Sequence, residues 1–183
     1  MSEGKPAPEN IVLVGFMGSG KSTVGRTLHQ RLGYPWVDMD HEITLRTGRT
    51  VPEIFAQDGE PAFRAMETEL LRELTATAGD QRIISTGGGV VGSEENRALL
   101  RRLGFVVWLD VGSDVIFERT MRNRDRPLLH DEDPRRRIET LLAMREPWYR
   151  ETAHLRVDTA GLDSTELAAG ILESARYFFT RGE

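Results

Sequence analysis

The sequence predicts an α/β protein in which a parallel sheet is covered by helices on both faces. Short apolar runs typical of buried strands alternate with longer segments of helical periodicity along the whole chain. A glycine-rich turn joins the first of these runs to the first helical segment. The 183 residues, 39% of them hydrophobic, suffice for one domain with its own core. We therefore expect a single domain over 1–183, with 1–9 as a loose tail.

Five short strands are expected, and two of them are apolar enough to be buried on both faces. The first, 11–14, reads IVLV and ends at Gly15, and FVVWL at 105–109 is the clearest buried strand of the chain. The others are expected at 36–39, 82–85 and 155–157. Neighbouring parallel strands need crossover connections, which are almost always right-handed. The helical segments between the strands supply these crossovers.

The helical segments follow the strands in order. They are expected at 21–32, at 41–77 with breaks near Gly48 and around 58–61, and at 93–103, 113–121, 134–145 and 164–179. Pro134 can occupy the first turn of its helix. Two segments are larger than a simple crossover needs: the helical stretch at about 40–77 and the charged, non-periodic stretch at about 122–133. We expect both to be insertions into the basic α/β body.

Composition excludes several function classes. The net charge is −5, which disfavours a general nucleic-acid binder, because the phosphate backbone rewards a basic surface. Without cysteine the chain has no disulfide, no thiolate metal site and no cysteine nucleophile. No segment has the length and apolar character of a signal peptide or a membrane span. A cytoplasmic protein without a membrane partner is expected.

The turn at 15–22 reads GFMGSGKS and fits the phosphate-binding pattern G-x-x-x-x-G-K-[ST] in full. The glycines let backbone N–H groups curl around phosphate oxygens, and the following helix adds the positive end of its dipole. Lys21 is expected to reach the β- and γ-phosphates, and the Ser22 hydroxyl can ligate Mg²⁺. The sequence therefore predicts a nucleoside triphosphate site in a P-loop NTPase-type fold.

Several classes of protein share this turn. A guanine-specific switch protein needs an Asn-Lys-x-Asp element late in the chain, but the only lysines are Lys5 and Lys21. A motor ATPase needs an acidic residue after a long apolar strand, for which Asp110 is a candidate and Asp38 a rival. The chain leaves little room for subdomains that transmit force, so a small-molecule kinase fits its size best.

Polar residues after the second and third strands are candidates for the acceptor side of such a site. Alternation along the second strand would place Asp38 and Asp40 on one side of it, near the glycine-rich turn. One carboxylate can hold Mg²⁺ and the other can orient or deprotonate a hydroxyl. Alternatively, Asp40 caps the following helix. Gly87, Gly88 and Gly89 permit close approach of a ligand to the backbone, or form a flexible connection.

Two arginines on predicted helices offer positive charge. Arg64 precedes Glu67 by three residues, so the two side chains can pair, and Arg145 lies near the predicted end of a later helix, before Pro147. As a pair, Arg64 and Arg145 can clamp a substrate carboxylate. The alternative is that both are solvated surface charges.

Positive charge also gathers around the segment at 122–133. The residues concerned are Arg119, Arg122, Arg124 and Arg126. We interpret the segment as a lid that excludes water and brings an arginine to the transferring phosphoryl group. The alternative is a solvated face in which neighbouring aspartates balance the charge.

In their order, these motifs resemble those of the shikimate kinase family. They are GFMGSGKSTVGRTL at 15–28, Asp38-x-Asp40, FRxxE at 63–67, GGG at 87–89, RPLL at 126–129, and Arg145 followed by a proline and an aromatic residue. The resemblance implies a five-stranded parallel sheet of order 2-3-1-4-5. It also implies transfer of the γ-phosphate of ATP to the 3-hydroxyl of shikimate, in aromatic amino-acid biosynthesis.

The resemblance assigns a role to each matching residue. ATP would be bound by Gly18, Ser19, Gly20, Lys21, Ser22, Thr23, Arg119, which stacks on adenine, and Arg126, the lid arginine. Mg²⁺, the expected cofactor, would be held by Ser22 and Asp38. Shikimate would be bound by Asp40, Arg64, Gly87, Gly88, Gly89 and Arg145, with both arginines on its carboxylate. The catalytic residues of this monomeric enzyme would be Lys21, Asp40 and Arg126.

Two other functions fit parts of the pattern. Gluconate kinase is similar in build and shares the phosphate loop and an acidic pair, but the three glycines and the two helix arginines count against it. A binding protein that has lost phosphoryl transfer is the second, against which the intact Lys21, Ser22 and acidic pair argue. The chain also departs from the family at 158–163, where it reads DTAGLD in place of an Arg-Asn pair.

Overall fold

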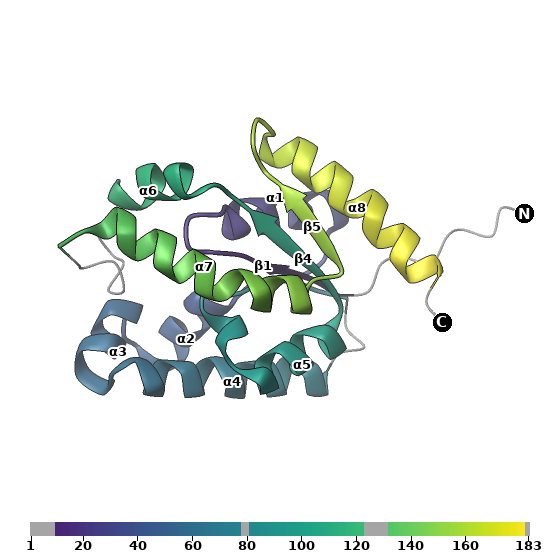
Figure 1. Cartoon of the computed structure of the whole chain (residues 1–183). Coiled ribbons are helices and arrows are strands. Elements are labelled where there is room, and N and C mark those ends of the chain that lie inside the picture. Colours follow the sequence, from purple (N-terminus) through teal and green to yellow (C-terminus); the bar gives the residue numbers. More distant parts are fainter. Residues whose placement is uncertain (1–9, 78–80, 123–131, 182–183) are drawn as a thin grey trace, which may run out of the picture.

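A five-stranded parallel sheet between two layers of helices forms the body of the protein (Figure 1). The structure is a computed structural model, and it describes residues 10–77, 81–122 and 132–181. The strands are β1 (Ile11–Val14), β2 (Trp36–Asp38), β3 (Ile83–Ser85), β4 (Phe105–Asp110) and β5 (Leu155–Asp158). Their order is β2-β3-β1-β4-β5, and all four neighbouring pairs are parallel. This confirms the predicted α/β class and the strand order that the family resemblance implied.

The central strand, β1, is buried on both faces because all of its side chains are apolar. Ile11 pairs with Ile83 of β3 on one side and with Phe105 of β4 on the other, and no residue of β1 is exposed to solvent. In β5, at the edge of the sheet, partly buried and exposed residues alternate instead. The most apolar runs of the sequence therefore occupy the middle of the sheet, as expected for a parallel sheet covered on both faces.

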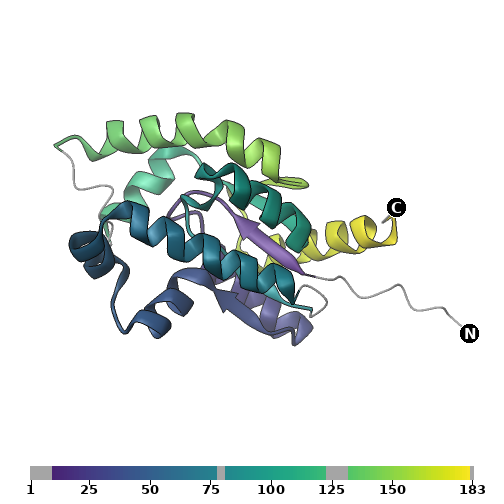
Figure 2. The ribbon, with the colours of Figure 1, turned by 90° about the horizontal axis from the view of Figure 1, so that it is seen from below.

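The helices divide between the two faces of the sheet (Figures 1 and 2). On one face, α1 (Lys21–Leu32) and α8 (Ser164–Thr180) pack against β1 and β4. The other face is covered by α2 (Met39–Thr47), α3 (Val51–Asp58), α4 (Glu60–Ala76), α5 (Glu94–Leu103) and α7 (Pro134–Thr152). A smaller apolar cluster joins α6 (Ser113–Met121) and α7 to the loop after β1.

The predicted helical insertion at about 40–77 is divided into three helices, and a glycine follows each of the first two. Gly48 follows α2 with φ +67°, and Gly59 separates α3 from α4 with φ +84°. Residues with a side chain rarely adopt such angles, so glycine ends each helix. Both predicted breaks are confirmed.

The second strand ends one residue earlier than predicted. Asp38 is its last residue and the N-cap of α2, where its carboxylate accepts a hydrogen bond from the backbone N–H of His41. Asp40 therefore lies in the first turn of a helix, and the prediction that strand alternation aligns the two carboxylates is wrong. The alternative that Asp40 caps this helix is also wrong, because Asp38 does so.

The helix that begins at Pro134 runs to Thr152, well beyond its predicted end near Arg145. Pro147 cannot donate the hydrogen bond to the carbonyl one turn earlier, and a proline inside a helix usually breaks it. Here Pro147 and Ala143 are exposed, so water can reach that carbonyl. Tyr149 and Thr152, both after the proline, are buried. Their burial stabilises the last turns of α7.

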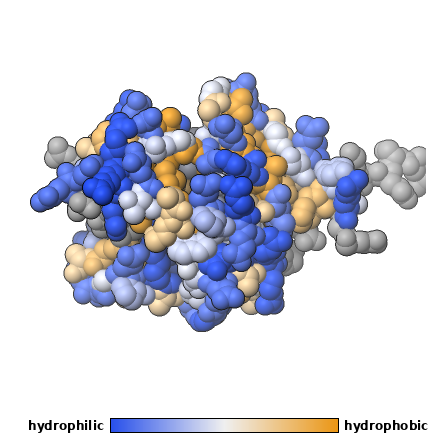
Figure 3. All heavy atoms as spheres, viewed as in Figure 1, coloured by the Kyte–Doolittle hydropathy of each residue, from blue (hydrophilic) through white to orange (hydrophobic). Residues whose placement is uncertain are grey.

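Hydrophilic residues cover most of the face of the molecule seen in Figure 3, with hydrophobic residues in small groups between them. Across the residues that the structure describes, no helix combines the length and the apolar character needed to cross a membrane.

Candidate active site

The predicted phosphate loop lies between β1 and α1, at the carboxyl edge of the sheet. Gly18 and Gly20 have φ angles of +77° and +95°, which favour glycine. Gly20 is the N-cap of α1 and has no side chain to cap the helix, which leaves the N–H groups of the first turn available to an anion. Residues 17–24 line a cavity of about 410 Å³. The loop can therefore cradle phosphate through its backbone.

Lys21 holds its ammonium group inside this loop. The side chain is only 8% exposed, and Nζ donates hydrogen bonds to the carbonyls of Gly15 and Phe16 at 2.8 and 2.9 Å. Lys21 also lines the cavity. The positive charge is thus positioned beside the space that a phosphate group would fill.

Ser22 and Asp38 come together on the wall of the same cavity. The Ser22 hydroxyl donates a hydrogen bond of 2.5 Å to Asp38 Oδ2. A hydroxyl and a single carboxylate are hard oxygen donors, the kind that Mg²⁺ takes up together with phosphate oxygens and water. Within the described ranges, no three acidic or histidine side chains gather as a metal site of their own. The donor chemistry of the pair fits a Mg²⁺ ion whose other ligands are phosphate oxygens and water.

Asp110, the other acidic candidate for this role, has a different partner. Its carboxylate accepts hydrogen bonds from the Arg156 guanidinium at 2.6 and 2.9 Å, and it lines a separate cavity with Trp108 and Tyr149. The geometry therefore favours Asp38 over Asp110 as the acidic partner of Ser22.

Asp40 and Gly88 bring the acceptor side of the site to the phosphate loop. Both line the cavity, from the first turn of α2 and from the glycine loop after β3, respectively. A methyl group on Gly88 would lie 2.8 Å from the backbone nitrogen of Met17, so any side chain there would push the two loops apart. Glycine at this position lets the acceptor-side backbone lie directly against the phosphate loop.

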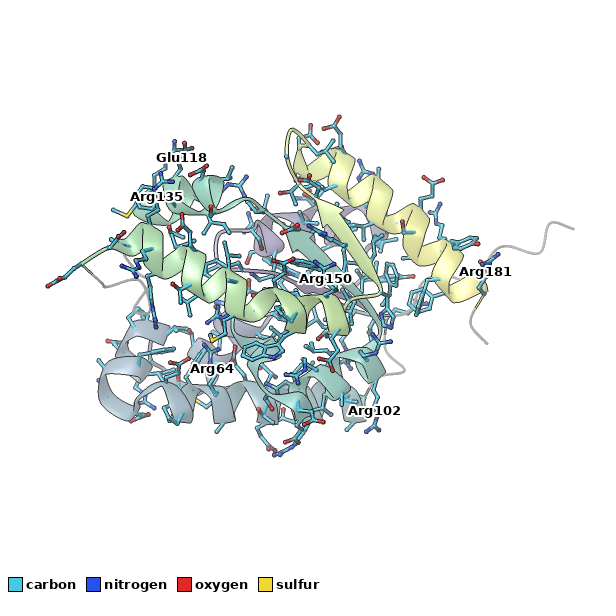
Figure 4. All side chains as sticks on the ribbon, in the orientation of Figure 1. Arg64, Arg102, Glu118, Arg135, Arg150 and Arg181 are labelled. Carbon is cyan, nitrogen blue, oxygen red and sulfur yellow. The ribbon has the colours of Figure 1, made fainter. Side chains whose placement is uncertain are left out.

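Arg64 lies on the side of α4 that faces α7 (Figure 4). Its guanidinium pairs with Glu67 at 2.6 Å and with Glu60 at 3.0 Å, as the spacing between Arg64 and Glu67 predicted. A side chain on Gly89 would overlap this guanidinium. The last glycine of the GGG run therefore makes room for Arg64 rather than providing a flexible connection alone.

Arg145 reaches the same glycine loop from α7. It is 4% exposed, its Nη1 donates a hydrogen bond of 3.2 Å to the carbonyl of Gly88, and its guanidinium lies over the ring of Phe16. Burial lowers the pKa of Arg145, and the nearby charge of Arg64 lowers it further. The alternative that Arg145 is a solvated surface charge is wrong.

Tyr149 is a residue of this site that the sequence analysis missed. It is 1% exposed, and its hydroxyl donates a hydrogen bond to the same Gly88 carbonyl that Arg145 contacts. Burial raises its pKa to about 12, so the hydroxyl keeps its proton. The signal in the sequence is its spacing: Tyr149 follows Arg145 by one helical turn, so both side chains lie on one face of α7.

Glu67 was predicted only as a partner of Arg64, but it also lies beside Gly87 and close to Asp40 and Arg145. Its side chain is fully buried, and burial raises its pKa to about 7 in spite of the neighbouring Arg64. The signal in the sequence is an acidic residue within the apolar stripe of α4, which Phe63, Leu70 and Leu74 otherwise form.

The structure describes only two of the four arginines near the predicted lid. Arg119 donates a hydrogen bond of 2.9 Å to the carbonyl of Gly18 and lines the cavity. Arg122 follows α6 and is exposed. Arg124 and Arg126 lie outside the described residues, as does most of the segment 122–133. Thr159 and Leu162 also line the cavity, so the stretch that departs from the family pattern borders the site.

Known proteins resemble the chain over almost its full length. The sequence model of the family described as shikimate kinase matches residues 17–176. The shikimate kinase of Symbiobacterium thermophilum is 45% identical over 175 residues, which cover 94% of this chain and 99% of that protein.

Solved structures of shikimate kinases also resemble this chain. The shikimate kinase of Acinetobacter baumannii in complex with shikimate superposes with a TM-score of 0.88 at 40% identity, covering 97% of this chain and 96% of that one. The shikimate kinase of Aquifex aeolicus gives a TM-score of 0.77 at 34% identity, with 95% and 99% covered. The chain is thus an enzyme, and it belongs to the shikimate kinase family.

Proposed function

We propose that this enzyme transfers the γ-phosphoryl group of ATP to the 3-hydroxyl of shikimate, with Mg²⁺ as cofactor, in aromatic amino-acid biosynthesis. One observation carries the proposal: a phosphate loop, two carboxylates and two buried or half-buried guanidinium groups meet at one edge of the sheet. ATP and shikimate as substrates agree with membership of the family. The related Acinetobacter baumannii structure contains shikimate.

On the nucleotide side, the backbone of residues 18–23 would bind the phosphates, and Arg119 would contact the adenine. Lys21 would stabilise negative charge on the transferring phosphoryl group. Mg²⁺, held by Ser22 and Asp38, would neutralise charge on the phosphate oxygens. Arg126 is proposed as the lid arginine from the RPLL motif alone, because it lies outside the described residues.

On the acceptor side, Asp40 would orient the 3-hydroxyl and accept its proton as the oxygen bonds to phosphorus. The bond between the γ-phosphorus and the bridging oxygen breaks, and ADP leaves. Arg64 and Arg145 would bind the carboxylate of shikimate. Gly87, Gly88 and Gly89 would allow the ring to approach the backbone closely.

The test is ADP release from Mg·ATP with shikimate, with gluconate and with no acceptor, measured in parallel. We expect turnover that depends on shikimate and stops when a chelator removes the metal. Phosphorus–proton correlation in the NMR spectrum of the product should place the new phosphate on carbon 3. Turnover with gluconate at the same efficiency, or a product phosphorylated elsewhere, would overturn the proposal.

We further propose that the enzyme is a cytoplasmic monomer of one domain, with neither nucleic acid nor membrane among its partners. Size-exclusion chromatography with light scattering should give a mass close to 20.6 kDa. A mass of twice that value would contradict the monomer.

A further inference from the structure

Glu67 carries a feature that the proposed reaction does not use. Its Oε2 accepts the hydrogen bond of 2.6 Å from Arg64. Its other oxygen, Oε1, is buried and has no hydrogen-bond partner among the residues that the structure describes. A buried carboxylate oxygen without a donor is unfavourable, because the negative charge has lost its hydration.

A second carboxyl group borders the same small space. A methyl group on Gly87 would overlap Glu67 Oε1 and lie 3.0 Å from Oδ1 of Asp40. If both groups were ionised, their like charges would repel each other, and little water would be present to screen the repulsion. A proton on Glu67 Oε1 would turn this repulsion into attraction, because the acid O–H can donate toward Asp40.

The protonation state of Glu67 sets the net charge of the groups around it. The titratable and charged groups that face it are Arg64 on its own helix, Asp40 on α2, and Arg145 and Tyr149 on α7. Tyr149 stays neutral, since its pKa is about 12. Glu60 also pairs with Arg64, but it is 46% exposed, so water screens its charge. Among the groups that face Glu67, two guanidinium groups are balanced by two carboxylates when Glu67 is ionised. With Glu67 protonated, one positive charge is left over.

We propose that Glu67 binds a proton when the acceptor arrives, and that its neutral form donates a hydrogen bond toward Asp40 while it accepts one from Arg64. The excess positive charge of Arg64 and Arg145 then balances the carboxylate of the acceptor. Glu67 is thus a positioning residue that adjusts the charge of the site. This inference rests on the proposed function, since it takes the acceptor to be an anion.

The proposal predicts that acceptor binding takes up a proton from solvent. Burial already raises the pKa of Glu67 to about 7, and an added anion raises it further. At pH values between the free and the bound pKa, each shikimate that binds brings about one proton with it, and Kd rises by up to about tenfold per pH unit. The carboxyl group of shikimate itself stays ionised between pH 6 and 9.

Isothermal titration calorimetry of the full chain with shikimate measures this uptake directly. Titrations at pH 6 to 9, each in two buffers of different ionisation enthalpy, give the number of protons bound. We expect an uptake in the wild-type protein near pH 7 to 8 that is lost in Glu67→Gln. Glutamine keeps the shape, accepts from Arg64 and donates toward Asp40 without titrating, so this variant should bind shikimate with a Kd that varies less with pH.

Glu60→Gln is the matched control, because Glu60 also pairs with Arg64 but is 46% exposed. The control should keep the proton uptake. If wild-type protein takes up no proton, or if Glu67→Gln takes up as many as wild type, the proposal is wrong. If shikimate neither binds nor supports ADP release in the wild-type protein, the proposed function fails instead.

Discussion

The proposed nucleotide half and the proposed acceptor half of the site are built in opposite ways. The nucleotide half is one continuous loop, and its chemistry comes mainly from backbone N–H groups exposed by glycines, with Lys21 and Ser22 at its end. The acceptor half is assembled from side chains on α2, α4 and α7 around the glycine loop. The first half depends on local conformation, whereas the second depends on how distant elements pack.

The charged and polar groups of the two halves also differ in their exposure to water. Ser22 and Thr23 at the nucleotide half are exposed, and Lys21 is hydrogen-bonded to the carbonyls of its own loop. On the acceptor side, Glu67 and Arg145 are removed from water and depend on each other and on Arg64. A change in the nucleotide half should therefore act on the reaction, whereas a change in the acceptor half should act on acceptor affinity and on stability together.

The largest effect should come from Lys21→Ala, which removes the only lysine among the residues that the structure describes. We expect kcat to fall by at least about 100-fold, as for loss of other groups that stabilise charge in a transition state. Steady-state kinetics with saturating shikimate and Mg·ATP measure the change. A kcat within tenfold of wild type would remove the functional distinction between the two halves.

Arg64→Ala should come next, and of the two substrates it should affect only shikimate. Loss of a charge-assisted contact worth about 1.5–3 kcal/mol raises the KM for shikimate by roughly 10- to 100-fold and leaves the KM for ATP nearly unchanged. Arg46→Ala is the control, since Arg46 also pairs with two glutamates but lies exposed on α2. An unchanged KM for shikimate would rule out Arg64 as a carboxylate ligand.

Tyr149→Phe tests how far packing positions the acceptor half. The variant loses the hydrogen bond to Gly88, which should lower the free energy of unfolding by about 1 kcal/mol. That corresponds to a decrease in Tm of about 2–4 °C for a chain of this size. Thermal unfolding measures the decrease, and the KM for shikimate should rise a few-fold. A lower Tm with an unchanged KM would confine Tyr149 to a structural role.

Glu67 should also make the free energy of unfolding depend on pH. Its pKa rises from the ordinary value of 4.5 to about 7 on folding, so the folded state binds the proton more tightly than the unfolded state. The stabilisation is complete below about pH 4.5 and is lost as the pH rises through 7. Urea unfolding at pH 5 and pH 8 should show a smaller difference for Glu67→Gln than for wild type.

The contrast explains what could be predicted from the sequence. The loop at 15–22 is contiguous and its glycines are dictated by backbone angles, so the motif alone predicted its place between β1 and α1. The order of apolar runs likewise predicted the class of sheet. Arg64 and Arg145 are 81 positions apart, and only their packing around Gly88 and Gly89 makes them neighbours; the family resemblance, not their spacing, paired them.

The errors of the sequence analysis have local physical causes. The strand ended early because Asp38 caps a helix, a competition between two structures that alternation does not represent. Pro147 in the sequence predicts a helix end, but the burial of Tyr149 and Thr152 after it outweighs one missing hydrogen bond. The spacing of Glu67 predicts only an ion pair with Arg64, because its burial depends on α2 and α7 as much as on its own helix.

The position of Lys21 has a practical consequence for covalent attachment. Besides the amino terminus, Lys5 and Lys21 carry the only primary amines of the chain. Lys21 is 8% exposed and hydrogen-bonded within its loop, so acylating reagents should reach it slowly. Mild treatment with such reagents should therefore leave the loop at 15–22 unmodified and its hydrogen bonds intact.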